Sequence, residues 1–456
     1  MMQLSQAAQW MGAEQLGPDA QVLRVVTDSR NIRPGDLFVA LGGENFDAHD
    51  FVAQALASGA VGAVVAPDFV LAGAALLRVA DPLLALGQLA QAWRACFTLP
   101  LIGVTGSNGK TSVKEMIRAI CAAEVGDEAV LATQGNLNNH IGLPLTLLQL
   151  RAHHRYAVIE MGMNHLGEIR YLTQLARPTV AVINNALRAH MGFFTSVTEI
   201  AQAKGEIVEG VSADGVLILN HDDPHLALWR ALRPAIRVCE FGWDAGDVHV
   251  VRCATDAGES TVSVLTPQGE FTTHLKVAGE HMVRNAVAAS AVAHSVGIDN
   301  AVIAQGLSAF STVKGRMHVL RAPSGATVID DSYNANPDSV RAALRVLASY
   351  PAPRYIVLGD MRELGTDAPA LHAEIGAYAR GLGIEHLWAL GSLCEHACAA
   401  FGEGAQHFAS MNTLSAQLQA EVGAAATVLV KGSNSMQMWR AIAPLLGRVD
   451  APVSSH

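Results

Sequence analysis

Short runs of β-branched and aliphatic residues alternate with longer Ala- and Leu-rich stretches along most of this chain. In its central part, such runs occupy residues 101–106, 156–162, 179–185 and 215–220. Unbroken apolar strands that alternate with helical stretches are typical of a parallel sheet covered by helices on both faces. The pattern therefore predicts a central α/β domain with a mostly parallel sheet.

The same pattern begins again near residue 315. Four further apolar runs, each followed by a plausible helix, occupy residues 327–333, 354–360, 386–391 and 427–433. This second series predicts another α/β domain, Rossmann-like, with a sheet of its own.

Before residue 82 the pattern is mixed. Its candidate strands, GDLFVAL, GAVGAVVAP and AALLRVA, predict a small separate α/β domain. The chain has 456 residues, which is enough for three domains of roughly 150 residues each. We therefore predict domains over residues 1–82, 83–314 and 315–456.

Composition and charge exclude several classes of protein. Half of the residues are apolar and only 16% are charged, which is typical of a folded globular chain. A net charge of −10 argues against a surface that coats nucleic acid or an anionic membrane, so a polyanionic ligand needs a local binding device. The apolar stretch over residues 51–67 carries Gln54 and Ser58, which favours an Ala-rich helix and a buried strand over a membrane span.

The cysteines and the first residues bear on the compartment. Residues 1–12 lack the features of a secretory signal, and six scattered cysteines suit a reducing environment, so we expect a cytoplasmic protein. Cys394 and Cys398 flank His396 in the segment CEHAC. That group lacks further ligands, so buried thiols in a helix are favoured over a metal site.

The sharpest local signal is GVTGSNGKTS, over residues 103–112, which follows a predicted strand and opens a helix. Glycines let backbone N–H groups surround phosphate oxygens, Lys110 supplies a cation, and Thr111 offers a hydroxyl to Mg²⁺. The spacing differs from the usual P-loop because Val104 stands where a glycine is expected. A chance glycine-rich turn is the alternative, but the strand–loop–helix context favours phosphate binding.

Two polar residues follow other predicted strands. Glu160 ends the run over residues 156–162, and His190 follows the run over residues 179–185. The carboxyl ends of parallel strands form the edge at which α/β proteins bind ligands. Together with the phosphate loop, these residues predict a Mg²⁺–nucleotide centre, against a cap or salt bridge for Glu160 and a structural role for His190. Lys204 by itself is typical of a solvated helix lysine.

Several further motifs follow one another along the chain: TGSNGKTSVKEM, GNLNNHIGLPLTLL, VIEMGMNHLGEI, NNALRAHMGFF, AKGEI, GEHMVRN, KGRM, IDDSYNANPDS, GDMRELG and LVKGSNSM. Their order resembles that in the Mur ligases of peptidoglycan synthesis. The resemblance extends from about Thr27 to Ser435. Within the family, SYNANPDS is similar to the segment of the members that add D-alanyl-D-alanine, and the DNP[RA] segment of the members that add diaminopimelate or lysine is not found.

The resemblance implies a site for ATP and, as we expect, two Mg²⁺ ions. Thr111 and Glu160 match ligands of one Mg²⁺, and His190 matches a ligand of a second. Lys204 matches a lysine that CO₂ carbamylates into a further metal ligand, which requires a lowered pKa of its amine. The matching catalytic residues are Lys110, Glu160, His190, Lys204 and Arg316. The matching ATP-binding residues are Gly106, Ser107, Asn108, Gly109, Lys110, Thr111, Ser112, Asn285, Arg316 and Asp331.

The resemblance also implies two further substrate sites. For the UDP-substrate, the matching residues are Ser29, Arg30, Asn138, Asn139 and His140. On the acceptor side, Lys431 resembles a lysine near the substrate carboxylate, and we interpret Asn334 and Asn336 as dipeptide contacts. The alternative for these asparagines is a turn set up by Asn336-Pro337.

The activity implied is the ATP-dependent addition of D-alanyl-D-alanine to UDP-N-acetylmuramoyl-tripeptide through an acyl phosphate, with domain closure to exclude water. Two alternatives stay open: another Mur-type or folylpolyglutamate-synthetase-like amide ligase, and a non-catalytic nucleotide-binding scaffold. The TDSR segment at residues 27–30 favours a UDP-sugar substrate, and intact Lys110, Glu160, His190 and Lys204 favour catalysis. We expect a monomer without nucleic-acid or membrane partners.

Overall fold

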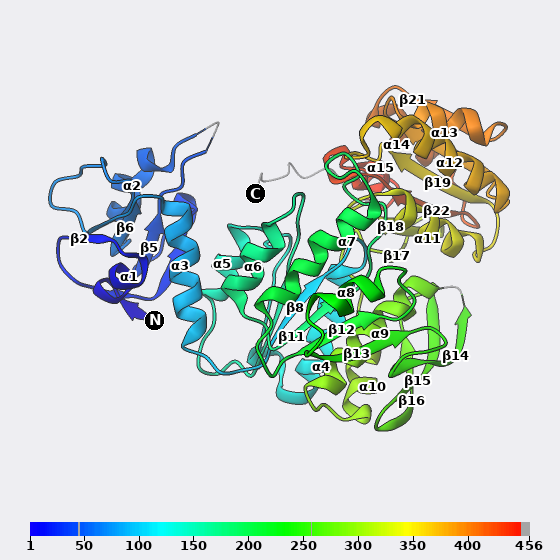
Figure 1. The fold of residues 1–456 in the computed structure, drawn as a ribbon. Coiled ribbons are helices and arrows are strands. Elements are labelled where there is room, and N and C mark those ends of the chain that lie inside the picture. The colour runs from blue at the N-terminus through cyan, green and yellow to red at the C-terminus, as the bar shows by residue number, and fades with distance from the viewer. Residues whose placement is uncertain (44–45, 257, 448–456) are drawn as a thin grey trace.

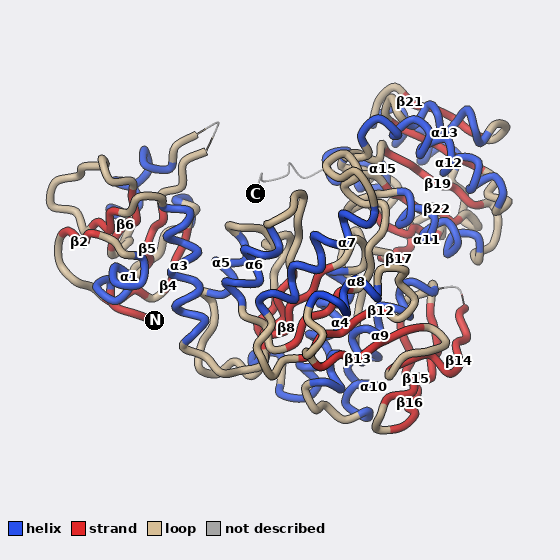
Figure 2. Tube along the Cα trace, viewed as in Figure 1, coloured by secondary structure: helices blue, strands red, loops and turns tan. Residues whose placement is uncertain are grey.

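The computed structural model describes residues 1–43, 46–256 and 258–447. Three α/β lobes follow one another along the chain, and the N-terminal and C-terminal lobes both flank the central one (Figure 1). In each lobe, strands are accompanied by helices on their outside (Figure 2). This architecture confirms the predicted fold class.

The N-terminal lobe is built on a five-stranded sheet with the order β2-β7-β6-β5-β4. Its strands are β2 (Glu14–Leu16), β4 (Arg24–Val26), β5 (Asp36–Val39), β6 (Gly62–Val65) and β7 (Leu76–Arg78); α1 (Leu4–Met11), α2 (Val52–Ala57) and the paired strands β1 (Met2–Gln3) and β3 (Gln21–Val22) complete it. Strands β5, β6 and β7 confirm the three predicted strands, and α2 followed by β6 confirms the interpretation of residues 51–67. Among the described residues, no helix is both long enough and apolar enough to cross a membrane.

Helix α3 (Pro82–Ala95) connects the N-terminal lobe to the central lobe. The Asp81 side chain accepts hydrogen bonds from the N–H groups of Leu83 and Leu84, and Pro82 occupies the start of the helix, where no N–H donor is needed. The helix packs against α1 and against α5 (Gly142–Leu147) and α6 (Glu168–Ala176). The predicted junction at residue 82 thus coincides with the start of a linking helix, and the exact domain limits stay predictions.

The central lobe contains a nine-stranded sheet with the order β16-β15-β14-β13-β12-β11-β8-β10-β9. Its strands are β8 (Leu101–Thr105), β9 (Val130–Ala132), β10 (Tyr156–Glu160), β11 (Val180–Ile183), β12 (Val216–Asn220), β13 (Arg237–Gly242), β14 (Val248–Asp256), β15 (Glu259–Thr266) and β16 (Gly269–Leu275). The pairs from β9 to β14 are parallel, and the four predicted strands are confirmed. The antiparallel extension β14-β15-β16 was not predicted, because its half-exposed strands carry no unbroken apolar run.

Helices cover both faces of this sheet. Successive side chains of a strand point to opposite faces, so neighbouring residues of β8 enter different cores. Ile102 packs with α4 (Lys110–Val125), α9 (Glu280–Ser295) and α10 (Asn300–Ala309), whereas Leu101 packs with α6 and α7 (Val197–Gly205). Helix α8 (Leu226–Leu232) lies beyond β12 in the chain. The arrangement confirms the predicted two-sided parallel sheet.

The C-terminal lobe has its own six-stranded sheet, with the order β17-β18-β22-β19-β20-β21. Its strands are β17 (His318–Arg321), β18 (Thr327–Asp331), β19 (Arg354–Gly359), β20 (His386–Leu390), β21 (Ala405–Phe408) and β22 (Thr427–Lys431). Its helices are α11 (Pro337–Ala348), α12 (Ala368–Gly381), α13 (Cys394–Phe401), α14 (Met411–Glu421) and α15 (Trp439–Ile442). Strand β17 is antiparallel to its neighbour, the other pairs are parallel, and the four predicted strands are confirmed.

Candidate active site

A cavity of about 730 Å³ lies between the central and C-terminal lobes, at the carboxyl ends of strands from both sheets. Residues at or just after the ends of β8, β10 and β11 line one side of it, and residues at or just after the ends of β18, β19 and β22 line the other. The predicted site residues that line it are Ser107, Asn108, Gly109, Lys110, Thr111, Ser112, Asn138, Asn139, Glu160, His190, Asn285, Arg316, Asp331, Asn334, Asn336 and Lys431. Those outside its lining are Ser29, Arg30, Gly106, His140 and Lys204.

The phosphate loop lies between the end of β8 and the start of α4, as the motif predicts. Gly109 caps α4 with φ +80°, in the left-handed region that favours glycine. Lys110 Nζ folds back over the loop and donates to the carbonyl oxygens of Gly106 (2.7 Å) and Ser107 (3.3 Å). Burial lowers the pKa of Lys110, the nearby Glu160 carboxylate opposes this shift, and Arg316 adds to it.

Glu160 ends β10 and is almost fully buried, at 2% exposure. Its carboxylate accepts hydrogen bonds from Thr111 Oγ1 (2.9 Å) and Asn138 Nδ2 (2.8 Å), and no ion pair of Glu160 is found among the described residues. A buried carboxylate that is hydrogen bonded only to a hydroxyl and an amide belongs to an oxygen-donor set that suits Mg²⁺. The residues present therefore fit the predicted metal.

His190 has a backbone φ of +59° and reaches the C-terminal lobe. Its Nδ1 lies 2.7 Å from Glu363 Oε2, and Gly192 N–H donates to the Glu363 carbonyl oxygen (2.7 Å). This contact leaves Nε2 as the nitrogen that could bind a metal. Sequence reasoning missed Glu363 as a functional residue, although it belongs to the motif GDMRELG, which is part of the family resemblance.

Lys204 lies on α7 and is 1% exposed, so the interpretation of a solvated lysine is wrong. No hydrogen bond or ion pair of its ammonium is found among the described residues. Burial, and then the positive charge of Lys110, lower its pKa well below the usual value. Lys204 can therefore adopt the neutral amine form that carbamylation requires.

The C-terminal side of the cavity carries a compact set of polar contacts. Lys431 is buried and donates to Asp331 Oδ2 (2.5 Å) and to the Asn334 carbonyl oxygen (2.9 Å). The Arg316 guanidinium lies 4.1 Å from the centre of the Tyr333 ring. The charge of Lys431 is thus paired within the lobe, whereas Arg316 faces the cavity over an aromatic ring.

Asn336 begins α11 and also touches the phosphate loop. Its Oδ1 accepts from Ser339 N–H (2.9 Å), its Nδ2 donates to Asn108 Oδ1 (2.7 Å), and Pro337 opens the helix. Where the alternative expects a turn set up by Asn336-Pro337, the structure has the start of a helix, with Asn336 as the N-cap and Pro337 as the first residue of α11.

The predicted UDP-side residues are divided between two places. Ser29 and Arg30 lie in a short 3₁₀ helix (Ser29–Asn31) of the N-terminal lobe, where Arg30 pairs with Asp28 (2.8 Å). Asn138 and Asn139 line the cavity, and His140 beside them is exposed. The structure therefore does not bring these two groups into one pocket.

The segment CEHAC forms the start of α13, and the prediction of buried thiols holds for Cys394, whereas Cys398 is only partly buried. Ligand atoms of Asp360, His372 and Cys394 lie within 4.8 Å of one another. Both ring nitrogens of His372 are already hydrogen bonded, one to Met361 N–H and one to the Ala368 carbonyl oxygen. Burial raises the pKa of the Cys394 thiol, so this cluster has the character of a packed core.

Three family models match the chain: Mur ligase middle domain over residues 104–293, Mur ligase glutamate ligase domain over residues 315–434, and Mur ligase family catalytic domain over residues 22–94. Together with the fold and the cavity, they define a ligase with a nucleotide-binding central lobe. The chain belongs to the Mur ligase family.

Relatives match over nearly the whole length. The UDP-N-acetylmuramoyl-tripeptide--D-alanyl-D-alanine ligase of Escherichia coli (strain K12) is 39% identical, over 95% of this chain and 96% of that protein. The crystal structure of MurF from Acinetobacter baumannii superposes with a TM-score of 0.91 at 35% identity, over 97% of this chain and 98% of its own. MurF ligase from Thermotoga maritima in complex with ADP gives a TM-score of 0.83 at 26% identity, covering 93% and 97%.

Proposed function

We propose that this protein is an ATP-dependent amide ligase that joins D-alanyl-D-alanine to UDP-N-acetylmuramoyl-tripeptide in the synthesis of peptidoglycan precursors. One observation carries the proposal: the phosphate loop, the buried Glu160 and the cationic C-terminal residues line a single cavity between two lobes. Relatives named for this reaction match over nearly the whole chain.

The reaction needs ATP because oxide is too poor a leaving group for direct amide formation from a carboxylate. An oxygen of the tripeptide carboxylate attacks the γ-phosphorus of ATP, the bond to the β-phosphate oxygen breaks, and ADP leaves. The amine of D-alanyl-D-alanine then attacks the acyl carbon, loses a proton, and phosphate departs. Lys110 and Arg316, on opposite sides of the cavity, stabilise the negative charge that develops on the transferred group.

Thr111 and Glu160 would hold one Mg²⁺, and His190 would hold a second. When bound, these ions supply charge stabilisation on the phosphate oxygens. Glu160 is suited to this role because both of its carboxylate oxygens accept from neutral donors only. The proposed carbamate on Lys204 would add an anionic ligand, and the buried, low-pKa amine supports it. The resemblance gives two ions, one at Thr111 and Glu160 and one at His190.

Substrate placement follows the lobes. The UDP end would lie on the N-terminal lobe near Ser29 and Arg30, the peptide would run past Asn138 and Asn139, and the dipeptide would approach from the C-terminal lobe. Lys431 is paired with Asp331 and donates to the Asn334 carbonyl oxygen. We therefore propose that Lys431 fixes the loop that carries Asn334, and that binding of a substrate carboxylate is not its sole role. We also propose that the protein is a cytoplasmic monomer with domains over residues 1–82, 83–314 and 315–456.

A phosphate-release assay tests this function. Release should require ATP, Mg²⁺, the UDP-tripeptide and D-alanyl-D-alanine together, and Lys110→Met should abolish it. Parallel reactions with single amino acids, with folate and glutamate, and with the UDP-dipeptide substrate test whether the protein is one of the alternative amide ligases. Release that is indifferent to the dipeptide would overturn the proposal, and ADP binding without any turnover would favour the scaffold alternative.

A further inference from the structure

The segment over residues 184–192 lies between the phosphate loop and the C-terminal lobe and contacts both. It follows β11 and lines the cavity through several of its residues. We call it the bridge segment. It makes one set of contacts with the phosphate loop and another with the C-terminal lobe.

On its central side, the bridge segment holds the phosphate loop by hydrogen bonds that each involve a backbone group of one of the two segments. Ser107 N–H donates to the Asn185 carbonyl oxygen (2.9 Å), and Asn108 N–H donates to Asn185 Oδ1 (2.9 Å). Leu187 N–H donates to Ser107 Oγ (2.9 Å), whose hydroxyl donates back to the Leu187 carbonyl oxygen (3.1 Å). With two further bonds, from Asn184 Nδ2 and Asn185 Nδ2 to the Asn108 carbonyl oxygen (2.9 and 3.1 Å), six hydrogen bonds tie the shape of the phosphate loop to the position of the bridge segment.

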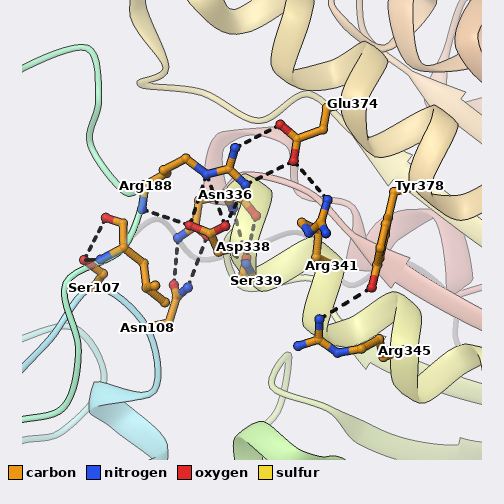
Figure 3. Close-up of polar contacts among 11 residues, drawn as sticks. Ser107, Asn108, Arg188, Asn336, Asp338, Ser339, Arg341, Arg345, Glu374 and Tyr378 are labelled. Atoms are coloured by element: carbon orange, nitrogen blue, oxygen red, sulfur yellow. Dashed lines mark hydrogen bonds and ion pairs between the residues drawn. The ribbon is translucent and has the colours of Figure 1, made fainter. Parts of the chain in front are cut away.

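On its other side, Arg188 ties the bridge segment to two helices of the C-terminal lobe. Its guanidinium donates to Asp338 at the start of α11 (2.7 Å) and to Glu374 of α12 (2.9 and 3.1 Å), and its backbone N–H also donates to Asp338 (2.9 Å). Figure 3 shows Arg188 reaching from the central lobe to both carboxylates. One side chain therefore joins three elements across the lobe interface.

The carboxylates are arranged to receive this arginine. Arg341 of the same lobe donates a hydrogen bond to Glu374 (3.2 Å), and its guanidinium lies 3.9 Å from the centre of the Tyr378 ring (Figure 3). The contact with Arg341 fixes the position of the Glu374 carboxylate from within the C-terminal lobe. The hydrogen bond from Arg188 is the main cause of the lowered pKa of Glu374. Arg188 is itself only 29% exposed, and paired donors in this fork geometry bind carboxylates more firmly than a solvated ion pair does.

We propose that the bridge segment couples nucleotide binding at the phosphate loop to docking of the C-terminal lobe, with Arg188 as the positioning residue. The inference rests on the proposed ATP-dependent function. When Arg188 is bound to the two carboxylates, the position of the bridge segment is fixed. The same docking of the C-terminal lobe brings Asn336 into hydrogen-bond contact with Asn108 of the phosphate loop. Because such coupling is reciprocal, loss of the arginine contact should weaken nucleotide binding, although Arg188 belongs to no phosphate-binding motif.

The test compares Arg188→Met with Arg170→Met. Arg170 is a matched control because it makes a similar two-bond pair with Glu209 (2.7 and 2.9 Å) within the central lobe, away from the cavity. We expect Arg188→Met to increase the radius of gyration of the ligand-free protein, to weaken ADP binding at least fivefold, and to raise KM for the dipeptide. Arg170→Met should leave all three unchanged, and Arg188→Lys should recover part of the loss.

Glu374→Gln provides a second variant in case Arg188→Met folds poorly, which thermal unfolding would reveal. The double variant Arg188→Met/Glu374→Gln should weaken ADP binding no further than Arg188→Met alone, since Arg188→Met already removes the contact that Glu374→Gln weakens. ADP binding and a radius of gyration equal to those of the unchanged protein, in folded Arg188→Met and Glu374→Gln, would overturn the coupling. The ADP-binding and radius-of-gyration readouts need no turnover, so a failed ligase assay with intact ADP and docking responses would refute the proposed reaction alone.

Discussion

Replacement of Gly109 by alanine tests whether the close packing at the phosphate loop supports nucleotide binding. Gly109 caps α4 with φ +80°. A Cβ at this position would lie 2.6 Å from Asn184 Nδ2 and closer still to Asn285 Oδ1. Both asparagines would have to shift, because real Cβ contacts of this length do not occur.

The magnitude has two parts. A left-handed backbone conformation costs a non-glycine residue about 1–2 kcal/mol. Displacement of the asparagines also breaks the hydrogen bond from Asn184 Nδ2 to Asn285 Oδ1 (3.0 Å), worth about 1 kcal/mol net. We therefore expect Gly109→Ala to lower the free energy of unfolding by about 2–3 kcal/mol. Since the family resemblance implies that Asn285 binds ATP, we also expect at least tenfold weaker ADP binding.

Gly167→Ala separates strain from packing. Gly167 caps α6 with φ +90°, in the same conformation, but a Cβ added to it would have no neighbouring atom within 4 Å. That variant should lose only about 1–2 kcal/mol through backbone strain and keep its ADP affinity. Chemical denaturation and calorimetric titration with ADP measure the two quantities. Equal ADP affinity in both variants would refute the argument from packing.

Three further predictions concern charged groups. Lys204→Ala should abolish phosphate release and regain some activity with added short carboxylates, and full activity without them would contradict the carbamate. Glu160→Gln should abolish Mg²⁺-dependent turnover while retaining the fold, because the amide keeps the contact with Thr111 but loses the charge; an unchanged Mg²⁺ dependence would exclude Glu160 as a ligand. Burial lowers the pKa of His281 to about 4, so the unfolded chain takes up its proton first, and stability should fall as the pH drops from about 6.5 to 4. His281→Gln should flatten that decline in denaturation measured against pH, and an unchanged slope would show that other groups cause it.

Local pattern determined much of the fold. The eight predicted strands of the two mostly parallel sheets are apolar runs with both faces buried, so they were visible in the sequence alone. The strands β9, β13, β17 and β21 of the same sheets are shorter or carry polar residues, and they were not predicted. The strands β14, β15 and β16 contain both buried and exposed residues, and the sequence pattern did not predict them. The hydrophobic pattern thus identified strands that are unbroken apolar runs and failed for strands that are short or carry polar or exposed residues.

The sequence by itself also determined the phosphate loop and the strand-end position of Glu160, since both depend on residues close together in the chain. Only the tertiary structure decided the surroundings of Lys204, because burial of one helix face depends on the elements packed over it. The same holds for Arg188 and Glu374, which lie 186 positions apart and meet only when two lobes dock. Charged residues on amphipathic helices look alike in a sequence, and the partner that each one finds is set by packing between distant segments.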